Sequence, residues 1–408
     1  MSDSASREMT SRCCVVGGGP AGMMLGLLLG RAGIDTVVLE KHADFLRDFR
    51  GDTIHPSTLE VLAELGLLEA LLQRPHDELR EIVGQIGEER LVIGDFSHLP
   101  TRCKFIALMP QWHFLDFLAE AAEPLPSFRL LRETAAERLV VEDGRIAGIV
   151  ARDKAGALTL RADLVIGCDG RHSTVRREAG LSSRDLGAPI DVLWLGLSKR
   201  PGDPGQTLGR FDDGRILVMI DRGDYWQCAF VIPKGGFAAL QASGLAHFHA
   251  ELAALMPPLA DRLSEIRSWD DVKLLTVAVD RLERWHRPGL LCIGDAAHAM
   301  SPIGGIGINL AIQDAVAAAN ILVPWLRRAP GPVAEAPLAA IERRRLLPTR
   351  LTQAMQVLIQ NRVIRRVLGT RGTLHAPAAL RLLRRFPVLR RIPARLVGIG
   401  FRPEHVRI

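Results

Sequence analysis

The stretch RCCVVGGGPAGMMLGLLLGRAGIDTVVLE, residues 12–40, decides the fold. The short apolar run at residues 12–17 enters a glycine turn and is expected to form a buried strand. Apolar side chains then fill residues 20–32 with no breaker except glycine, which is typical of a buried helix. The β-branched run 36–40 predicts a second strand, so the whole segment is expected to be a parallel βαβ unit.

The glycines of this unit, GGGPAG at residues 17–22, satisfy the pattern G-x-G-x-x-G. Gly17 permits the tight turn, Gly19 lets a pyrophosphate approach the backbone, and Gly22 lets helix and strand pack closely. The helix that begins here points its N–H groups and positive dipole end at the phosphates, and an acid after the second strand binds ribose hydroxyls. The cofactor-binding residues predicted from this unit are Gly17, Gly19, Pro20, Ala21, Gly22, Glu40 and Lys41.

Two later segments also pair a buried strand with an aspartate. In residues 164–176 (LVIGCDGRHSTVR), Asp169 is either a helix cap or a cofactor ligand. In residues 294–309 (GDAAHAMSPIGGIGIN), Asp295 can reach a ribose hydroxyl, and a glycine-rich turn opens a long helix. The free N–H groups of that helix can face the electron-rich pyrimidine edge of a flavin. The predicted contacts from these segments are Asp169, Asp295, Pro302, Gly305, Gly307, Ile308 and Asn309.

Together these three marks resemble the para-hydroxybenzoate hydroxylase family, the single-component (group A) FAD-dependent monooxygenases, and they occur in that family's order. Two fainter likenesses support the resemblance. Arg50, ahead of a helix, looks like the family's arginine that contacts FAD, and Gln111 looks like its flavin-contacting glutamine. The likeness is weaker over the last part of the chain.

The resemblance implies that NADH or NADPH reduces FAD, that dioxygen adds to the reduced ring, and that the flavin hydroperoxide hydroxylates an aromatic substrate. Such chemistry needs no side-chain nucleophile, so no catalytic residue is assigned. His55, His113 and His298 fall near the flavin-binding segments and are candidates for a proton donor or base. The only tyrosine is Tyr225, which excludes a relay of two tyrosines and argues against para-hydroxybenzoate itself as the substrate.

The predicted fold is α/β (α+β), with a Rossmann-like FAD-binding domain, an antiparallel substrate-binding sheet and C-terminal helices. Strand-like runs for the sheet are residues 192–197, 216–220, 227–232 and 272–279, with a helix near 247–256. The expected boundaries are 1–75, 101–185 and 286–330 for the FAD-binding domain, 76–100 and 186–285 for the substrate-binding domain, and 331–408 for the helical region. We expect a cavity for an apolar, multi-ring substrate, lined by Trp194, Phe211, Met219 and Trp226. Core packing is the alternative role for these four side chains.

The chain of 408 residues carries 52 basic and 46 acidic residues, a net charge of +6, and its arginines crowd the last quarter. These arginines either form a membrane-surface element or, as we favour, lie on solvated faces of helices packed over the FAD-binding domain. No recognition helix or aromatic-interleaved basic motif predicts nucleic-acid binding. No uninterrupted apolar run has membrane-spanning length, the N-terminus does not resemble a secretory signal, and the six cysteines show no metal-ligand spacing. We expect a cytoplasmic monomer or homodimer without a metal.

Two other flavin chemistries remain as alternatives. An FAD-dependent reductase of isoprenoid or polyene double bonds shares the fold and the glycine marks, although the complete D-G-x-x-S-x-x-R pattern favours a hydroxylase. A halogenase resembling the tryptophan enzymes is expected to carry W-x-W-x-I-P, which this sequence lacks.

Overall fold

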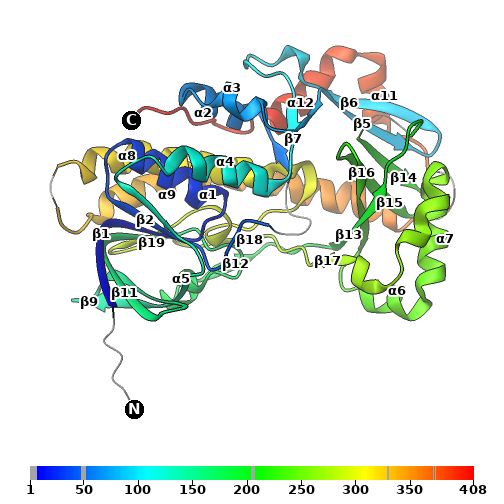
Figure 1. Ribbon diagram of the computed structural model, residues 1–408. Coiled ribbons are helices and arrows are strands. Elements are labelled where there is room, and N and C mark those ends of the chain that lie inside the picture. The colour runs from blue at the N-terminus through cyan, green and yellow to red at the C-terminus, as the bar shows by residue number, and fades with distance from the viewer. Residues whose placement is uncertain (1–6, 47–51, 204–206, 329, 371, 373) are drawn as a thin grey trace.

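The computed structural model describes residues 7–46, 52–203, 207–328, 330–370, 372 and 374–408 (Figure 1). The expected βαβ unit lies in the middle of an eight-stranded sheet. β1 (Arg7–Val16) pairs in parallel with β2 (Thr36–Leu39), and α1 (Pro20–Arg31) connects them. All residues of α1 from Ala21 to Gly30 are buried, as expected for a helix that is apolar on every side.

The order of strands in this sheet brings distant segments of the chain together. The path is β19 (His286–Arg287), β20 (Leu290–Cys292), β11 (Gly156–Gly167), β1, β2 and β8 (Phe128–Leu131). β1 has β2 on one side and β11 on the other, both parallel to it. The strand order therefore reverses beside β1, and ligands of open α/β sheets bind at the carboxyl ends of strands at such a point.

β11 also continues into an antiparallel meander with β10 (Arg145–Asp153) and β9 (Ala135–Glu142). β9 and β10 are joined by a turn at Asp143-Gly144, where both residues have positive φ. In Figure 1 the meander lies below the sheet, on the side opposite to the helices.

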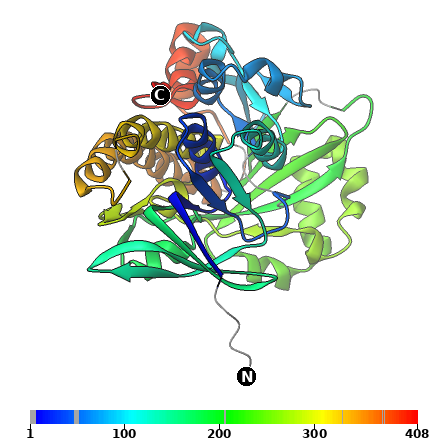
Figure 2. The ribbon, with the colours of Figure 1, turned by 60° about the vertical axis from the view of Figure 1, so that its left-hand side comes forward.

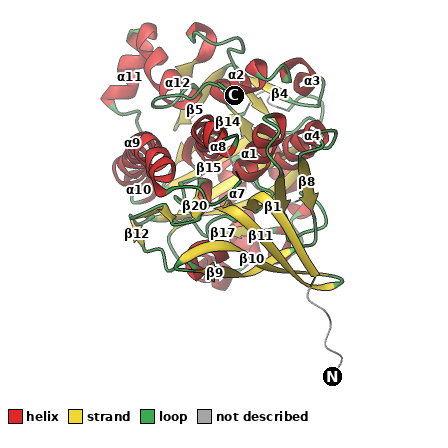
Figure 3. Cartoon of the chain, turned by 90° about the vertical axis from the view of Figure 1, so that its left-hand side faces the viewer, coloured by secondary structure: helices red, strands yellow, loops and turns green. Residues whose placement is uncertain are grey.

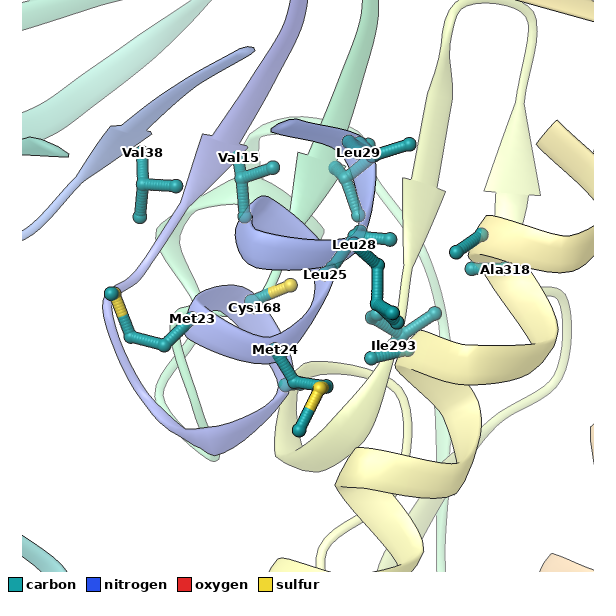
Figure 4. Close-up of a cluster of buried hydrophobic side chains, with 14 of the residues drawn as sticks. Val15, Met23, Met24, Leu25, Leu28, Leu29, Val38, Cys168, Ile293 and Ala318 are labelled. Carbon is teal, nitrogen blue, oxygen red and sulfur yellow. The ribbon is translucent and has the colours of Figure 1, made fainter. Parts of the chain in front are cut away.

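Helices cover the other face of the sheet. Figure 1 shows α1 there with α4 (Gln111–Ala122), α8 (Ile306–Leu326) and α9 (Glu335–Ile359). Val15 and Val38 of the strands, Leu28 of α1 and Ala318 of α8 belong to one buried cluster (Figure 4). The span 303–326 has the length and hydropathy of a membrane-crossing helix, but 83% of its apolar window is buried inside the protein. This helix therefore serves as a core element.

A seven-stranded sheet forms the second lobe. Its order is β17 (Lys273–Leu275), β13 (Ile190–Ser198), β16 (Tyr225–Pro233), β15 (Arg215–Asp221), β14 (Leu208–Asp212), β5 (Glu81–Ile86) and β6 (Glu89–Asp95). All neighbours are antiparallel except β14 and β5. Three of the four expected strands are confirmed in slightly longer form, whereas the run 272–279 is a strand only over β17. The helix expected near 247–256 is α7 (Leu245–Leu255), which follows α6 (Phe237–Ser243).

A three-stranded sheet connects the two lobes, in the order β3 (Thr53–Ile54), β7 (Ile106–Leu108) and β4 (Asp77–Leu79). β4 falls within the segment 76–100 assigned from sequence to the substrate-binding domain, but it pairs with β7. Two helices follow β3, namely α2 (Pro56–Glu64) and α3 (Leu68–Leu72). Gly66, at φ +71°, follows the end of α2, as is typical of helix C-termini. Short connections are α5 (Thr174–Glu178) and the pair β12 (Ser183–Asp185) with β18 (Asp280–Leu282).

The C-terminal residues are helical, but they divide between the two lobes. α9 packs on α8, and it continues through Pro348. A π-helical turn (Gln360–Ile364) leads into α10 (Arg365–Leu368). α11 (Ala378–Arg385) and α12 (Arg391–Gly398) pack against β6 of the second sheet, and Figure 3 shows them near β5 at the edge of the molecule. The prediction that these helices cover the FAD-binding domain therefore holds for α9, whereas α11 packs on the second sheet and α12 contacts both β6 and β7.

Candidate functional site

Four adjacent parallel strands end at one edge of the first sheet. Gly17 follows β1, Glu40 follows β2, Asp169 lies just beyond β11, and Asp295 lies just beyond β20. The three motifs quoted from the sequence are thus brought together at the crevice where the strand order reverses.

The glycine motif has the geometry that its spacing predicts. Gly17 has φ +107°, and a Cβ atom there would lie 2.5 Å from the carbonyl oxygen of Cys168. A Cβ atom on Gly22 would lie 1.9 Å from the carbonyl oxygen of Gly17, so only glycine lets α1 approach β1 this closely. A Cβ atom on Gly19 would meet nothing within 4 Å. The protein itself leaves the space beside Gly19 open, as a bound pyrophosphate requires.

Helix N-termini at the crevice differ in how they are capped. Among the described residues, no side chain caps α1, which begins at Pro20 and Ala21 after Gly19, or α8, which begins after Gly305. α5 is instead capped by the hydroxyl of Ser173, which accepts a hydrogen bond from the N–H of Arg176 (2.9 Å). The uncapped N–H groups of α1 and α8 are therefore the ones available to an anion or a flavin edge.

Glu40 supports the glycine turn. Its carboxylate, almost wholly buried, accepts hydrogen bonds from the N–H of Gly18 (3.0 Å) and from the N–H of His42 (3.0 Å). These bonds place the acid at the end of β2 directly against the turn. Lys41 is exposed beside it.

Asp169 caps α5. Its carboxylate accepts hydrogen bonds from the hydroxyl of Ser173 and from the N–H of Val175 (3.1 Å). Burial raises the pKa of Asp169, and the bond from Ser173 offsets part of that rise. Of the two roles that the sequence leaves open for this residue, the structure shows the cap. Contact with a cofactor remains a prediction.

Asp295 contrasts with Asp169. It lies in the short 3-10 turn Gly294–Ala296, is half-buried, and makes no hydrogen bond or ion pair with the described residues. A half-buried carboxylate at the strand-end edge without a protein partner is suited to accept hydrogen bonds from ligand hydroxyls. Of all the predicted contacts, Asp295 therefore has the geometry most favourable for a ribose or ribityl chain.

The glycine turn before α8 fits closely against β3. Pro302 begins a 3-10 turn (Ile303–Gly305), and Gly305 has φ +62°. A Cβ atom on Gly305 would lie 2.1 Å from Oγ1 of Thr53, which donates a hydrogen bond to the Gly305 carbonyl oxygen (2.9 Å). Gly307 is half-buried and Ile308 is buried in the first turn of α8.

The side chain of Asn309 holds this turn to β3 and α2. Its Oδ1 accepts hydrogen bonds from the N–H of His55 (2.8 Å) and from Oγ1 of Thr58 (2.7 Å). Its Nδ2 donates to the carbonyl oxygens of Thr53 (3.1 Å) and Gly305 (3.3 Å). An amide has two acceptor and two donor positions, and all four are used. Any contact of Asn309 with a cofactor is therefore left to its backbone.

A buried charge network lies behind the Gly294–Asp295 turn. The carboxylate of Asp314 accepts hydrogen bonds from the N–H of Gly294 (3.1 Å), from Nε2 of His298 (2.6 Å) and from Nε of Arg345 (2.8 Å). Arg345 also forms an ion pair with Glu404 (3.3 Å). Burial acts to raise the pKa of Asp314, but the charges and hydrogen bonds of His298 and Arg345 lower it overall. The network fixes the backbone that carries Asp295.

A second buried ion pair, which the sequence did not suggest, joins Asp52 to Arg222 where the two lobes meet. Their side chains are 5% and 3% exposed. Asp52 also accepts a hydrogen bond from the N–H of Gln111 (3.2 Å), and Nε of Arg222 donates to Gln227 (3.0 Å). Burial raises the pKa of Asp52, and the charge of Arg222 offsets part of the rise. Gln111 therefore lies beside this cluster at the start of α4, whereas Arg50 lies outside the described residues.

The four residues predicted to line a substrate cavity lie on two opposite faces of the second sheet. Trp194 and Phe211 lie on the face toward α9 and α10, together with Val218. Met219 and Trp226 lie on the opposite face, packed under α7. Of the two roles that the sequence left open for Met219 and Trp226, the structure shows core packing, because both lie on the outer face of the sheet, turned away from the first lobe and covered by α6 and α7. Figure 1 shows these helices on the outer side of the sheet.

Two of the histidine candidates are buried with structural partners. His55 donates from Nδ1 to the carbonyl oxygen of Val397 in α12 (2.7 Å), and burial lowers its pKa to about 4. His298 is bonded to Asp314. His113 is half-buried beside Trp112, and its Nδ1 has no partner among the described residues. A proton-transfer role for any of the three remains a prediction.

The arrangement fits the cofactor that the sequence predicts. The open space beside Gly19, the uncapped starts of α1 and α8 and the unpartnered Asp295 lie along one edge, as an extended dinucleotide requires. A family model described as FAD binding domain matches residues 10–347. The chain belongs to this family. It is one of the flavoprotein monooxygenases that resemble para-hydroxybenzoate hydroxylase, and FAD is its cofactor.

Relatives of known activity agree with this assignment. The monooxygenase is 37% identical over 391 residues to 6-methylpretetramide 4-monooxygenase of Streptomyces rimosus. The aligned residues cover 94% of this chain and 91% of that protein. It is 26% identical over 323 residues to para-nitrophenol 4-monooxygenase of a Pseudomonas species, covering 77% and 78% of the two chains. The predicted class of enzyme, an FAD-dependent monooxygenase, is confirmed.

Solved structures confirm the fold. PqsL of Pseudomonas aeruginosa superposes with a TM-score of 0.73 at 23% identity, covering 88% of this chain and 98% of that one. The anhydrotetracycline hydroxylase OxyS of Streptomyces rimosus superposes with a TM-score of 0.72 at 23% identity, covering 96% and 76%. A flavin-dependent brominase, Bmp2, reaches a TM-score of 0.72 at 14% identity, so the fold alone does not separate hydroxylases from halogenases.

Proposed function

We propose that this monooxygenase hydroxylates a multi-ring aromatic substrate with dioxygen, using NADH or NADPH as the electron donor. The main support is the 37% identity, over nearly the whole chain, with a relative named for a 4-monooxygenation of 6-methylpretetramide. In the balanced reaction the nicotinamide supplies two electrons, one oxygen atom enters the substrate C–H bond, and the other leaves as water.

FAD, when bound, supplies the redox chemistry and the activation of oxygen. The chain's own residues bind and orient it. Gly17 and Gly22 shape the turn, Gly19 leaves space for the pyrophosphate, Asp295 accepts hydrogen bonds from hydroxyls, and the start of α8 presents N–H groups to the flavin edge. The charge network of Asp314 keeps Asp295 in position.

The substrate side is the face of the second sheet that carries Trp194, Phe211 and Val218. The polar groups at its margin are Arg222, whose Nη1 atom has no acceptor among the described residues, and Gln227, whose amide lies against the carboxylate of Asp52. A cationic group suits an oxygen that carries negative charge, such as a phenolate. We therefore assign Arg222 to holding an acidic hydroxyl of the ring system while the apolar face holds its carbon skeleton.

We also infer a cytoplasmic location and a monomer or homodimer. The electron donor is a cytoplasmic nucleotide, and all six cysteines are buried free thiols, as expected in a reducing compartment.

The test uses purified protein loaded with FAD. NADH and NADPH oxidation under labelled dioxygen is followed with multi-ring phenols, single-ring phenols and polyenes. The proposal expects at least one multi-ring phenol to accelerate oxidation and to gain one labelled oxygen atom. Gain of oxygen only by single-ring phenols would contradict the substrate class, and reduction of a polyene without oxygen uptake would favour the reductase alternative.

A further inference from the structure

The charges of the chain are strongly segregated. Residues 343–403 contain fifteen arginines and no lysine, aspartate or glutamate. The rest of the chain holds 37 basic and 46 acidic residues, so it is net negative although the whole protein is net positive. Most of the acid-free segment lies beyond the part matched by the family model, which ends at residue 347. Folding of the FAD-binding domain therefore does not explain the segregation.

The outer surface of α11, α12 and the turn between them is apolar as well as basic. Four large apolar side chains there are between 47% and 58% exposed, namely Leu382, Phe386, Val388 and Ile392. Exposed arginines alternate with them, at Arg381, Arg384, Arg385, Arg391 and Arg395. Single exposed apolar residues are common on protein surfaces, but a continuous group of this kind marks an interaction site.

α9 repeats the pattern along its outward face. Leu347, Leu351 and Leu358 are between 41% and 56% exposed, and their spacing places them on one side of the helix. Arg343 and Arg350 are exposed beside them. The opposite side of α9 is buried against the loop that precedes α8. Figure 3 shows α9, α10 and α11 along the same side of the molecule, and we refer to the two basic, apolar surfaces together as the C-terminal face.

We propose that this face docks on the surface of an anionic lipid bilayer. Peripheral helices bind bilayers by inserting apolar side chains below the headgroups while cationic side chains contact the lipid phosphates. Arginine suits this arrangement because its guanidinium binds phosphate oxygens in pairs and its aliphatic stem lies along apolar surface. The absence of acidic residues from residues 343–403 lowers the repulsion that an anionic surface would meet, and one acidic partner next to these arginines is Glu89 of β6, which forms an ion pair with Arg384 (3.6 Å).

A second copy of this chain fits the face less well. A twofold dimer through this face would place the same patch on both partners and bring arginine against arginine. The proposed docking is also peripheral. Among the described residues, the helix long enough to cross a bilayer, residues 303–326, is buried between α1 and α9. The proposal is independent of which aromatic substrate the enzyme takes.

The test uses the full chain loaded with FAD and vesicles of phosphatidylcholine, with or without phosphatidylglycerol. We expect co-sedimentation with the anionic vesicles only, decreasing as ionic strength rises. The double variants Phe386→Ser/Ile392→Ser and Arg384→Gln/Arg385→Gln should each bind at least roughly tenfold more weakly while retaining FAD. Matched controls far from this face, Val141→Ser (62% exposed) and Arg129→Gln, should bind like the wild type.

Three outcomes would overturn the proposal. The first is failure to sediment with anionic vesicles at low ionic strength. The second is sedimentation that the two double variants leave unchanged. The third is a concentration-dependent dimer, measured by sedimentation velocity without lipid, that the same variants abolish, which would make a second copy the occupant of the face.

Discussion

The carbonyl oxygen of Gly17 lies 1.9 Å from the position that a Cβ atom on Gly22 would occupy. The first turn of α1 therefore packs directly on the end of β1, with no room for a methyl group. This contact aims the uncapped N-terminus of α1 at the strand-end edge, where Glu40, Asp169 and Asp295 lie.

The two ends of the glycine motif should respond differently to the same substitution. Gly22→Ala forces backbone atoms apart and should cost the apoprotein about 2 kcal/mol of unfolding free energy. Gly19→Ala meets nothing within 4 Å in the protein, so it should leave apoprotein stability unchanged but weaken FAD binding roughly tenfold, about 1.4 kcal/mol. Urea unfolding of the apoprotein and fluorescence titration with FAD measure the two effects. Wild-type affinity in Gly19→Ala would show that the pyrophosphate lies elsewhere.

Substitutions of the two strand-end aspartates, Asp169 and Asp295, should have different effects on apoprotein stability and on FAD affinity, measured by the same two assays. Asp169→Ala removes the cap of α5 and should lower apoprotein stability by about 1 kcal/mol. Asp295→Ala removes a carboxylate with no partner among the described residues, so the apoprotein should keep its stability while FAD binding weakens. If Asp295→Ala destabilised the apoprotein and left FAD affinity intact, its assignment as a cofactor ligand would be wrong.

Replacing only one partner of the ion pair between Asp52 and Arg222 should lower the free energy of unfolding strongly. Arg222→Met leaves a buried carboxylate without its cation and should cost about 3–5 kcal/mol, with a larger loss at higher pH, where Asp52 is ionised. The double variant Asp52→Asn/Arg222→Met should lose less than the sum of the single variants. Urea unfolding of all three gives the coupling energy. The exposed pair Arg129–Asp35 is the matched control, and Arg129→Met should change stability by less than about 1 kcal/mol.

If Arg222 also holds the substrate, Asp52→Asn/Arg222→Met should raise KM for a phenolic substrate more than it lowers kcat. Steady-state NAD(P)H oxidation coupled to product formation measures the two constants. An unchanged KM would limit Arg222 to a structural role.

The free energy of unfolding should fall in mild acid, because the pKa of His55 is lower in the folded protein than in the unfolded chain. Burial lowers its pKa from 6.5 to about 4, so the unfolded chain binds a proton at a higher pH than the folded protein does. The contribution is fully present above pH 6.5 and is lost as the pH falls toward 4, by up to about 3 kcal/mol. His55→Asn keeps a donor for Val397 but does not titrate, so its unfolding free energy should depend less steeply on pH. Equal slopes for the two proteins would contradict the assignment.

Much of the site could be predicted because its signals are local. The spacing of Gly17, Gly19 and Gly22 specifies a turn and a close helix contact within a few residues. Parallel strands that each end in Glu40, Asp169 or Asp295 must bring these acids to one edge. The role of Asn309 was only partly predictable, because its hydrogen bonds go to β3 and α2, which are far away in the sequence.

The remainder depends on tertiary structure. Nothing near Asp52 in the sequence points to Arg222, since their pairing requires both lobes to be in place. Apolar residues occupy both faces of β15 and β16, so no alternation in the sequence reveals that Met219 and Trp226 face α7 while Trp194 faces the first lobe. The sequence also does not reveal that α9 continues through Pro348, a residue type that ordinarily ends a helix, because the packing of α9 on α8 is what stabilises it.

The link from Glu404 through Arg345 and Asp314 to Gly294 sets an order of events during synthesis. Chains emerge from the ribosome with the N-terminal part first, and the glycine motif is made long before Glu404. We expect the complete network behind the turn that carries Asp295 to form only after residue 404 has left the ribosome. The monooxygenase is expected to acquire its flavin only after this last segment has been released, and a nascent chain held short of Glu404 should stay colourless.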